Sequence, residues 1–198
     1  DLSINISNTH KPVIKGGCLI FGNHPTGLDP YILSSIIERD DVYIVADIYQ
    51  QRKGNNIGKH IVPIVYARTQ KNLDNREFLN KIGFYIMRQF TGYVDKNLVK
   101  IQNEQTVKTA GKLIQEGHVV IIFPDGGSNN PEFWYNGIGE VIKTASVKGN
   151  PVQLLAANIS GISSFKLWRH FLFNRKTYLQ KYPINIKLSQ NLSLEDLQ

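Results

Sequence analysis

The segment Asn-His-Pro-Thr-Gly-Leu-Asp, residues 23–29, contains two side chains that could transfer a proton. An imidazole accepts a proton near neutral pH, and a carboxylate on its second ring nitrogen fixes the tautomer and stabilises the imidazolium. His24 and Asp29 could form such a pair only if the turn between them folds back, because five-residue spacing along a helix points side chains apart. The segment therefore predicts a general base, His24, oriented by Asp29. The alternatives are an exposed or capping histidine and a helix N-cap role for Asp29.

The sequence offers only weak protein nucleophiles for such a base. There is no G-x-S-x-G motif, and the segments around Ser128 and Ser163 are poor substitutes for one. Cys18 lies inside an apolar run, where we expect a small core residue rather than a thiolate. The five histidines and one cysteine lack metal-ligand spacing, so we expect no bound metal. The remaining candidate is a hydroxyl of the substrate.

The elements that must position these residues follow from the hydrophobic pattern. Short apolar runs alternate with helical patterns, which predicts an α/β domain. The runs are rich in β-branched residues and almost continuously apolar, as in strands buried on both faces. The predicted strands are Cys18–Phe21, Val42–Ala46, Ile61–Tyr66, Val119–Phe123, Val152–Asn158 and Ile184–Leu188.

Four helices are predicted between these strands. The first begins with Asp29 as N-cap and Pro30 at the first helical position, and continues through YILSSIIER. The third ends at Gly117, which can adopt the left-handed C-terminal conformation. The other predicted spans are Asp74–Phe90 for the second helix, about Glu104–Glu116 for the third and about Gly139–Val147 for the fourth.

Two loops leave their strands at the carboxyl end, where α/β sheets usually bind ligands. His24 lies in the loop after the first predicted strand. The loop Pro124–Glu132, with sequence PDGGSNNPE, follows the apolar strand VVIIF. Both loops are therefore candidates for ligand binding, although Asp125-Gly126-Gly127 could also be a plain turn.

At these residues the sequence resembles the glycerolipid acyltransferases of the lysophosphatidic acid acyltransferase type. NHPTGLD is similar to the family motif N-H-x4-D. Three further blocks follow in the family's order: VPIVYAR ends at Arg68, IIFPDGGSN contains Asp125, and GNPVQLLAANI ends at Ile159. Together the four blocks span about Leu19 to Ile159, most of the chain.

The resemblance implies an α/β fold with a mixed, mostly parallel sheet flanked by helices. It also implies transfer of a fatty acyl group from an acyl-CoA or acyl-carrier-protein thioester to a hydroxyl of a lyso-phospholipid or related lipid. His24 would be the base and Asp29 its orienter, while backbone N–H groups near the motifs would bind the oxyanion. No bound cofactor is expected, because the thioester is already activated. The implied substrate-binding residues are Asn23, Arg68, Asp125, Gly126, Gly127 and Ser128, with Arg68 on the acceptor's phosphate.

The third block departs from the family pattern F-P-E-G-T-R. Asp125 replaces the glutamate, and Gly127 and Ser128 stand in the places of Thr and Arg. Aspartate keeps the charge and could still orient a hydroxyl, but serine cannot replace a bidentate arginine clamp on phosphate. Arg68 would then hold a phosphate alone or with a nearby lysine. A lyso-aminolipid or another hydroxylated lipid is therefore a competing acceptor.

The charge of the chain favours an anionic partner. The net charge is +7, and residues 164–182 interleave five Lys or Arg with aromatic residues and contain no acidic residue. This composition suits an anionic membrane surface but also a core element with a basic outer face. Residues 76–90 are a second amphipathic candidate, for which core packing is the stronger interpretation. No apolar run approaches the roughly 20 residues needed to span a bilayer.

We therefore expect a single domain over residues 1–198, with a motif-bearing core at about 18–160 and a basic aromatic part at 161–198. The expected location is cytoplasmic and peripheral on the membrane. The expected partners are the thioester donor, the lipid acceptor, an anionic membrane and, for a carrier-protein donor, acyl carrier protein. Nucleic acid is not an expected partner, because no recognised binding motif is present.

Two alternatives to acyl transfer follow from the same residues. A thioesterase-like hydrolase would use His24 to activate water. A non-catalytic, basic module that binds lipid or nucleic acid would not need His24 at all.

Overall fold

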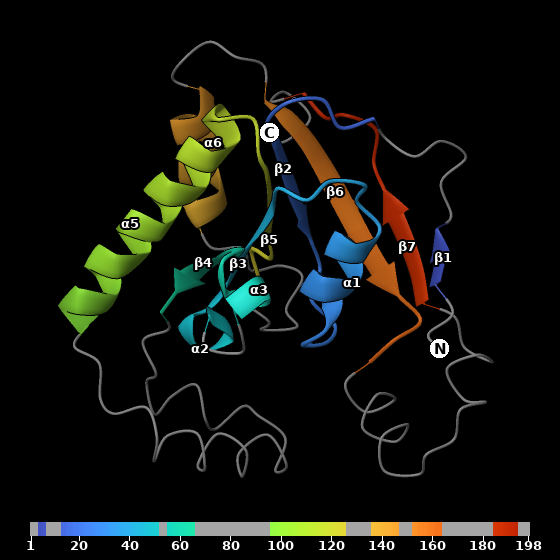
Figure 1. Cartoon of the computed structure of the whole chain (residues 1–198), viewed down its shortest axis with the longest axis horizontal. Helices are drawn as coiled ribbons and strands as arrows, with labels where there is room; N and C mark the ends of the chain where they lie inside the picture. Colours follow the sequence, from blue (N-terminus) through green and yellow to red (C-terminus); the bar gives the residue numbers. More distant parts are fainter. Residues whose placement is uncertain are drawn as a thin grey trace, which may run out of the picture.

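The computed structural model describes residues 4–6, 13–51, 55–65, 96–125, 136–146, 152–163 and 184–193. Within these residues one seven-stranded sheet has the order β1-β7-β6-β2-β5-β3-β4 (Figure 1). The strands are β1 (Ile4–Ile6), β2 (Cys18–Gly22), β3 (Val42–Asp47), β4 (Ile61–Ile64), β5 (Val119–Ile122), β6 (Gln153–Ser160) and β7 (Ile184–Leu188).

The sheet is parallel except at one pairing. β6, β2, β5, β3 and β4 all run in the same direction, whereas β7 is antiparallel to β6 and pairs in parallel with β1. The predicted α/β class with a mixed, mostly parallel sheet is therefore confirmed. Because β2 and β5 are parallel neighbours, the loops that follow them begin side by side at one edge of the sheet.

The described helices flank this sheet. They are α1 (Asp29–Ser35), α2 (Ile48–Gln51), α3 (Asn55–Gly58), α5 (Lys96–Gln115) and α6 (Gly137–Ser146). α5 and α6 lie on one side of the central strands and α1 on the other (Figure 1). In the part of the chain that the structure describes, no helix is long and apolar enough to cross a membrane.

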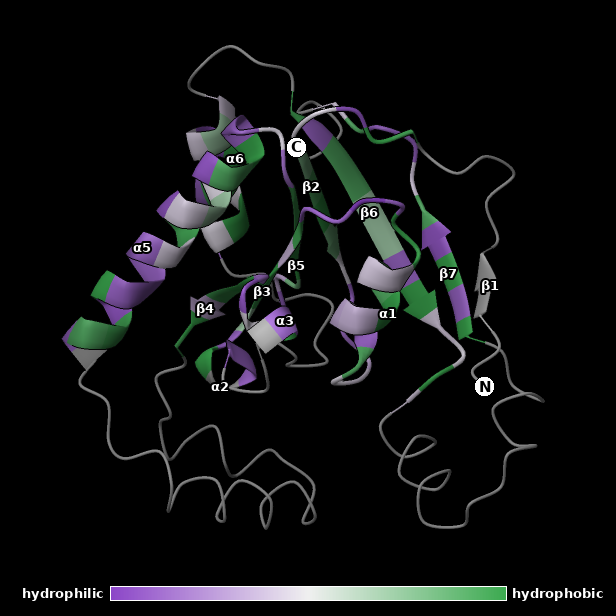
Figure 2. Cartoon of the chain, viewed as in Figure 1, coloured by the Kyte–Doolittle hydropathy of each residue, from purple (hydrophilic) through white to green (hydrophobic). Residues whose placement is uncertain are grey.

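Alternating residues of the buried strands supply the two core layers. Cys18 and Ile20 of β2 pack with Leu33 of α1, whereas Leu19 packs on the other face with Ile114 of α5. Figure 2 shows green over much of the central strands, whereas β7 and α5 carry both colours. Such continuous hydrophobicity is the mark of a strand buried on both faces. Cys18 is fully buried, which confirms it as a core residue, and this burial raises the pKa of its thiol to about 12.

The six predicted strands are all present, with Tyr66 outside the described residues. The prediction missed β1, α2 and α3, which are only three or four residues long. The helix predicted at about Gly139–Val147 is α6. The one predicted over Asp74–Phe90 lies outside the described residues.

Two helix boundaries were wrong. α5 begins at Lys96 rather than near Glu104. The prediction missed its first turns because Leu98 and Ile101 there are exposed and do not follow the pattern of a helix face that packs on the core. α1 ends at Ser35, with Ile36 as C-cap, although the apolar pattern continues to the buried Ile37. Gly117 follows α5 with a φ of 95°, as its predicted C-terminal role requires.

Candidate active site

The loop that carries His24 is fixed to the neighbouring strand β6 before it turns. A Cβ on Gly22 would lie 2.3 Å from the carbonyl oxygen of Ala157, so only glycine allows this close approach of β2 and β6. The Asn23 side chain donates from Nδ2 to the Ile159 carbonyl (2.8 Å) and accepts the Ile159 N–H at Oδ1 (2.7 Å). The Asn23 amide thus adds a further rung to the β2–β6 ladder. Its predicted contact with substrate stays a prediction.

His24 and Asp29 meet as the spacing argument requires. His24 Nδ1 lies 2.9 Å from Asp29 Oδ2, and the side chains are 23% and 0% exposed respectively. An ionised carboxylate only accepts hydrogen bonds, so Nδ1 donates the proton in this contact. The other ring nitrogen, Nε2, is then the one with a free lone pair. This geometry makes His24 chemically able to act as a base through Nε2.

The turn between the two residues also holds Asp29. The Thr26 backbone N–H donates to Asp29 Oδ2, and the Thr26 hydroxyl donates to Asp29 Oδ1 at 2.8 Å. Asp29 is the first residue of α1 and Pro30 follows it, while Leu28 holds the N-cap position without a side-chain cap bond. The predicted N-cap role of Asp29 is therefore wrong by one residue. The reason is that its carboxylate points back into the loop.

The loop after β5 contacts the His24 ring. The ring of Phe123 stacks on the His24 ring, with centroids 4.5 Å apart and an interplanar angle of 25°. Two residues further on, Asp125 is buried, at 7% exposure. The first and third sequence blocks therefore meet at the carboxyl ends of the neighbouring strands β2 and β5. Of the other predicted site residues, Arg68, Gly126, Gly127 and Ser128 lie outside the described residues.

Thr26 and Phe123 were not among the predicted site residues. A signal for Thr26 was present, because Thr26-Gly27-Leu28-Asp29 has the S/T-x-x-D/E spacing of a capping box. In such a box the acidic side chain accepts the backbone N–H of the Ser or Thr, as Asp29 does here. Phe123 carried no comparable signal, since an aromatic residue at a strand end is ordinary.

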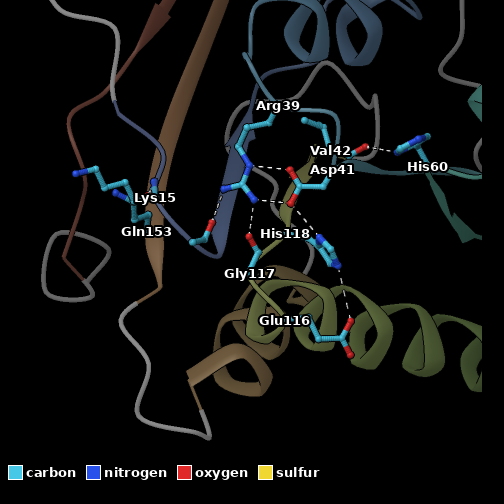
Figure 3. A network of polar contacts seen from close by, with 10 residues as sticks. Lys15, Arg39, Asp41, Val42, His60, Glu116, Gly117, His118 and Gln153 are labelled. Atoms are coloured by element: carbon cyan, nitrogen blue, oxygen red, sulfur yellow. Dashed lines mark hydrogen bonds and ion pairs between the residues drawn. The ribbon is translucent and has the colours of Figure 1, made fainter.

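A second His–Asp pair, drawn in Figure 3, lies at the amino ends of β3 and β5, whereas His24 follows the carboxyl end of β2. His118 Nδ1 is 2.9 Å from Asp41 Oδ2. The two residues directly precede the paired positions Val119 of β5 and Val42 of β3, which explains their contact. Arg39 donates from Nε and Nη2 to Asp41, and also binds the carbonyl oxygens of Gly16 and Gly117.

The Arg39 guanidinium determines the electrostatics of this second pair. Its hydrogen bonds to Asp41, reinforced by the bond from His118, hold the pKa of that carboxyl well below its usual range. The same contact raises the pKa of Arg39. Because Arg39 already neutralises the charge of Asp41, this carboxylate stabilises a neighbouring imidazolium less strongly.

The comparison with protein families agrees with the site. A model described as Acyltransferase matches residues 3–157. This span covers well over half of the chain, so the chain belongs to the acyltransferase family, and the resemblance to the glycerolipid acyltransferases is confirmed. The curated proteins gave no match.

Proposed function

We propose that this acyltransferase moves a fatty acyl group from an acyl-CoA or acyl-carrier-protein thioester to a hydroxyl of a lyso-phospholipid or related lipid. In this proposal His24 is the general base and Asp29 orients it. The observation that carries the proposal is the contact of 2.9 Å between His24 Nδ1 and the buried Asp29 carboxylate. It stands at the carboxyl ends of β2 and β5, where parallel sheets usually bind their ligands.

The reaction needs one proton shuttle and no metal or bound cofactor. His24 Nε2 takes the proton of the acceptor hydroxyl as its oxygen attacks the carbonyl carbon of the thioester. The tetrahedral intermediate then breaks its C–S bond, and the imidazolium returns the proton to the departing thiol. An ester and a free thiol result. The negatively charged Asp29 stabilises the imidazolium between these two steps.

Asp29 suits this role because its other partners among the described residues are neutral. The backbone N–H and the hydroxyl of Thr26 hold the carboxylate without cancelling its charge. In a site from which water is largely excluded, a charge–charge interaction is stronger than in bulk solvent. The full burial of Asp29 therefore supports its assignment as the orienting carboxylate.

The acceptor is inferred from sequence alone. A lysophosphatidic acid type of acceptor needs a phosphate site, which would fall to Arg68 because the third block lacks the family's arginine. A lyso-aminolipid or other hydroxylated lipid requires no such clamp. Asn23, Asp125, Gly126, Gly127 and Ser128 are the further candidates for substrate contact.

The proposed location is the cytoplasmic surface of an anionic membrane, with acyl carrier protein as an additional partner if it supplies the acyl group. The supports are the net charge of +7 and the basic aromatic composition of residues 164–182, which lie outside the described residues. Attraction of a basic surface to anionic lipid weakens with salt.

The test supplies acyl-CoA or acyl-carrier protein together with a panel of lyso-lipids and identifies the products by mass spectrometry. We expect a new ester from the wild type and about 10²- to 10⁴-fold less from His24→Ala, since this is what general base catalysis typically contributes. His118→Ala is the matched control, with unchanged turnover. Full activity in His24→Ala would overturn the mechanism.

A second arm omits the acceptor. Free fatty acid released at the same rate without any lyso-lipid would show a thioesterase-like hydrolase. Vesicle or RNA binding without turnover of any thioester, unaffected by His24→Ala, would show a non-catalytic binding module. Either outcome contradicts the proposed transfer.

A further inference from the structure

We propose that Thr26 is a positioning residue that sets the tautomer of His24 through Asp29. The inference rests on the proposed function for its catalytic consequence, but its structural part can be measured without any substrate. Thr26 is buried, at 3% exposure, in the turn between the two members of the pair.

Thr26 contacts both oxygens of the Asp29 carboxylate. Its backbone N–H donates to Oδ2, the oxygen that also accepts from His24 Nδ1. Its hydroxyl donates to Oδ1 at 2.8 Å. A carboxylate turns readily about its last torsion, because this sp³–sp² rotation has broad minima. Two donors from one residue, one on each oxygen, hold Oδ2 toward the imidazole.

The direction of the Thr26 hydroxyl bond is itself fixed. Thr26 Oγ1 also accepts the Leu28 backbone N–H at 3.2 Å. A backbone N–H can only donate and an ionised carboxylate can only accept, so the hydroxyl proton must point to Asp29. The hydroxyl therefore acts as a donor to Oδ1, while His24 Nδ1 donates to Oδ2.

This arrangement does more than cap a helix. A cap satisfies backbone N–H groups at a helix start, and the bond from Leu28 N–H serves that purpose. The bond from the hydroxyl to Oδ1 satisfies no backbone group; it constrains the side chain on which His24 depends. Removal of this bond should loosen the carboxylate and let the Nε2–H tautomer of His24 compete. In that tautomer Nε2 already carries a proton and cannot act as a base.

Thr26→Val removes the hydroxyl but keeps the shape and the backbone N–H. The first measurement uses protein labelled with ¹⁵N in its histidines and reads the tautomer of each ring from long-range ¹H–¹⁵N spectra, above the pH at which the rings titrate. We expect His24 to hold one tautomer, Nδ1–H, in the wild type and in Thr26→Ser, and a mixture in Thr26→Val. His118, which Asp41 holds independently, should keep one spectrum in all three proteins.

The second measurement is acyl transfer under the conditions that give wild-type turnover. Thr26→Val should lower kcat about tenfold with KM nearly unchanged, because the lost bond involves a charged group. Thr26→Ser should restore kcat. Thr106→Val is the matched control, since Thr106 is also buried and donates its hydroxyl to backbone carbonyls, but in α5. Its kcat should equal the wild-type value. If Thr26→Val does not fold, Thr26→Ala removes the same hydroxyl.

The outcomes separate the two proposals. A single Nδ1–H tautomer of His24 in folded Thr26→Val overturns the positioning role. A tautomer mixture with an unchanged kcat overturns its catalytic consequence. If the wild type transfers no acyl group to any acceptor, the proposed function fails, while the spectra still decide whether Thr26 orients the pair.

Discussion

The two His–Asp pairs have the same contact distance but different surroundings. In each pair the histidine Nδ1 lies 2.9 Å from a carboxylate oxygen. Asp29 is fully buried, and its other partners in the described part of the chain, both from Thr26, are neutral. Asp41 keeps 32% of its side chain exposed and is bound by the Arg39 guanidinium. Distance alone therefore does not distinguish the two pairs; the exposure of each carboxylate and the charge of its other partners do.

Position in the sheet separates the pairs in a second way. His24 follows β2 and contacts Phe123 after β5, at the carboxyl ends of the strands. His118 and Asp41 precede β5 and β3, at the amino ends, where Arg39 ties together the chain at Gly16, Asp41 and Gly117. We infer that the first pair serves chemistry and the second holds the loops at the opposite edge.

The largest contrast should come from the same substitution in each carboxylate. Asp29→Asn places an amide opposite Nδ1 and favours the wrong tautomer, so kcat should fall by about 10³-fold. Asp41→Asn should leave kcat within about twofold of the wild type, because it changes only the far edge of the sheet. Initial rates of acyl transfer, normalised to folded protein, decide the comparison. Equal losses in the two variants would mean that the pairs are not functionally distinct.

A smaller effect, this time on stability, should follow from removing Arg39. Arg39→Met loses the bonds to Asp41 and to two backbone carbonyls, and should lower the free energy of unfolding by about 2 kcal/mol. Lys108→Met on the exposed face of α5 is the control and should change it by less than about 0.5 kcal/mol. Urea denaturation measures both. A stability like that of the control would contradict a structural role for the second pair.

The smallest expected effect is a difference in acid stability. The pKa of Asp41 is lowered in the folded protein, chiefly by the Arg39 hydrogen bond. Asp41 therefore stabilises the fold fully above its ordinary pKa, and this contribution is lost as the pH falls below about 4. The advantage of the wild type over Asp41→Asn should thus be larger at about pH 6 than at about pH 3. A constant difference in unfolding free energy across this range would show that the ion pair contributes nothing.

The sequence predicted the first pair and could not predict the second, for a physical reason. His24 and Asp29 are close along the chain, and the turn residues between them constrain how the segment folds. His118 and Asp41 are 77 residues apart and meet only because β3 and β5 are neighbours in the sheet. Strand order is a property of the whole fold, and no local pattern around either residue encodes it.

The same distinction explains the other successes and errors. Continuous apolar runs located the strands, because burial on both faces leaves a plain mark in the sequence. The start of α5 was missed because, of its first apolar residues, only Val99 is buried, while Leu98 and Ile101 are exposed. Asp29 was taken as an N-cap because Asp before Pro is typical of one. Its carboxylate instead accepts a hydrogen bond from His24. The sequence rules for helix ends do not describe such a contact between side chains.

The burial of Cys18 has a practical consequence for studying the site. The chain has one cysteine, which is inaccessible and whose thiol has a pKa of about 12, so thiol-directed reagents should leave the folded protein unlabelled. Gly27 lies in the turn between His24 and Asp29; it is exposed, and a Cβ added there meets no atom within 4 Å. A cysteine introduced at Gly27 would therefore be the single reactive thiol of the folded chain. A fluorophore attached to it could report the arrival of a lipid beside His24.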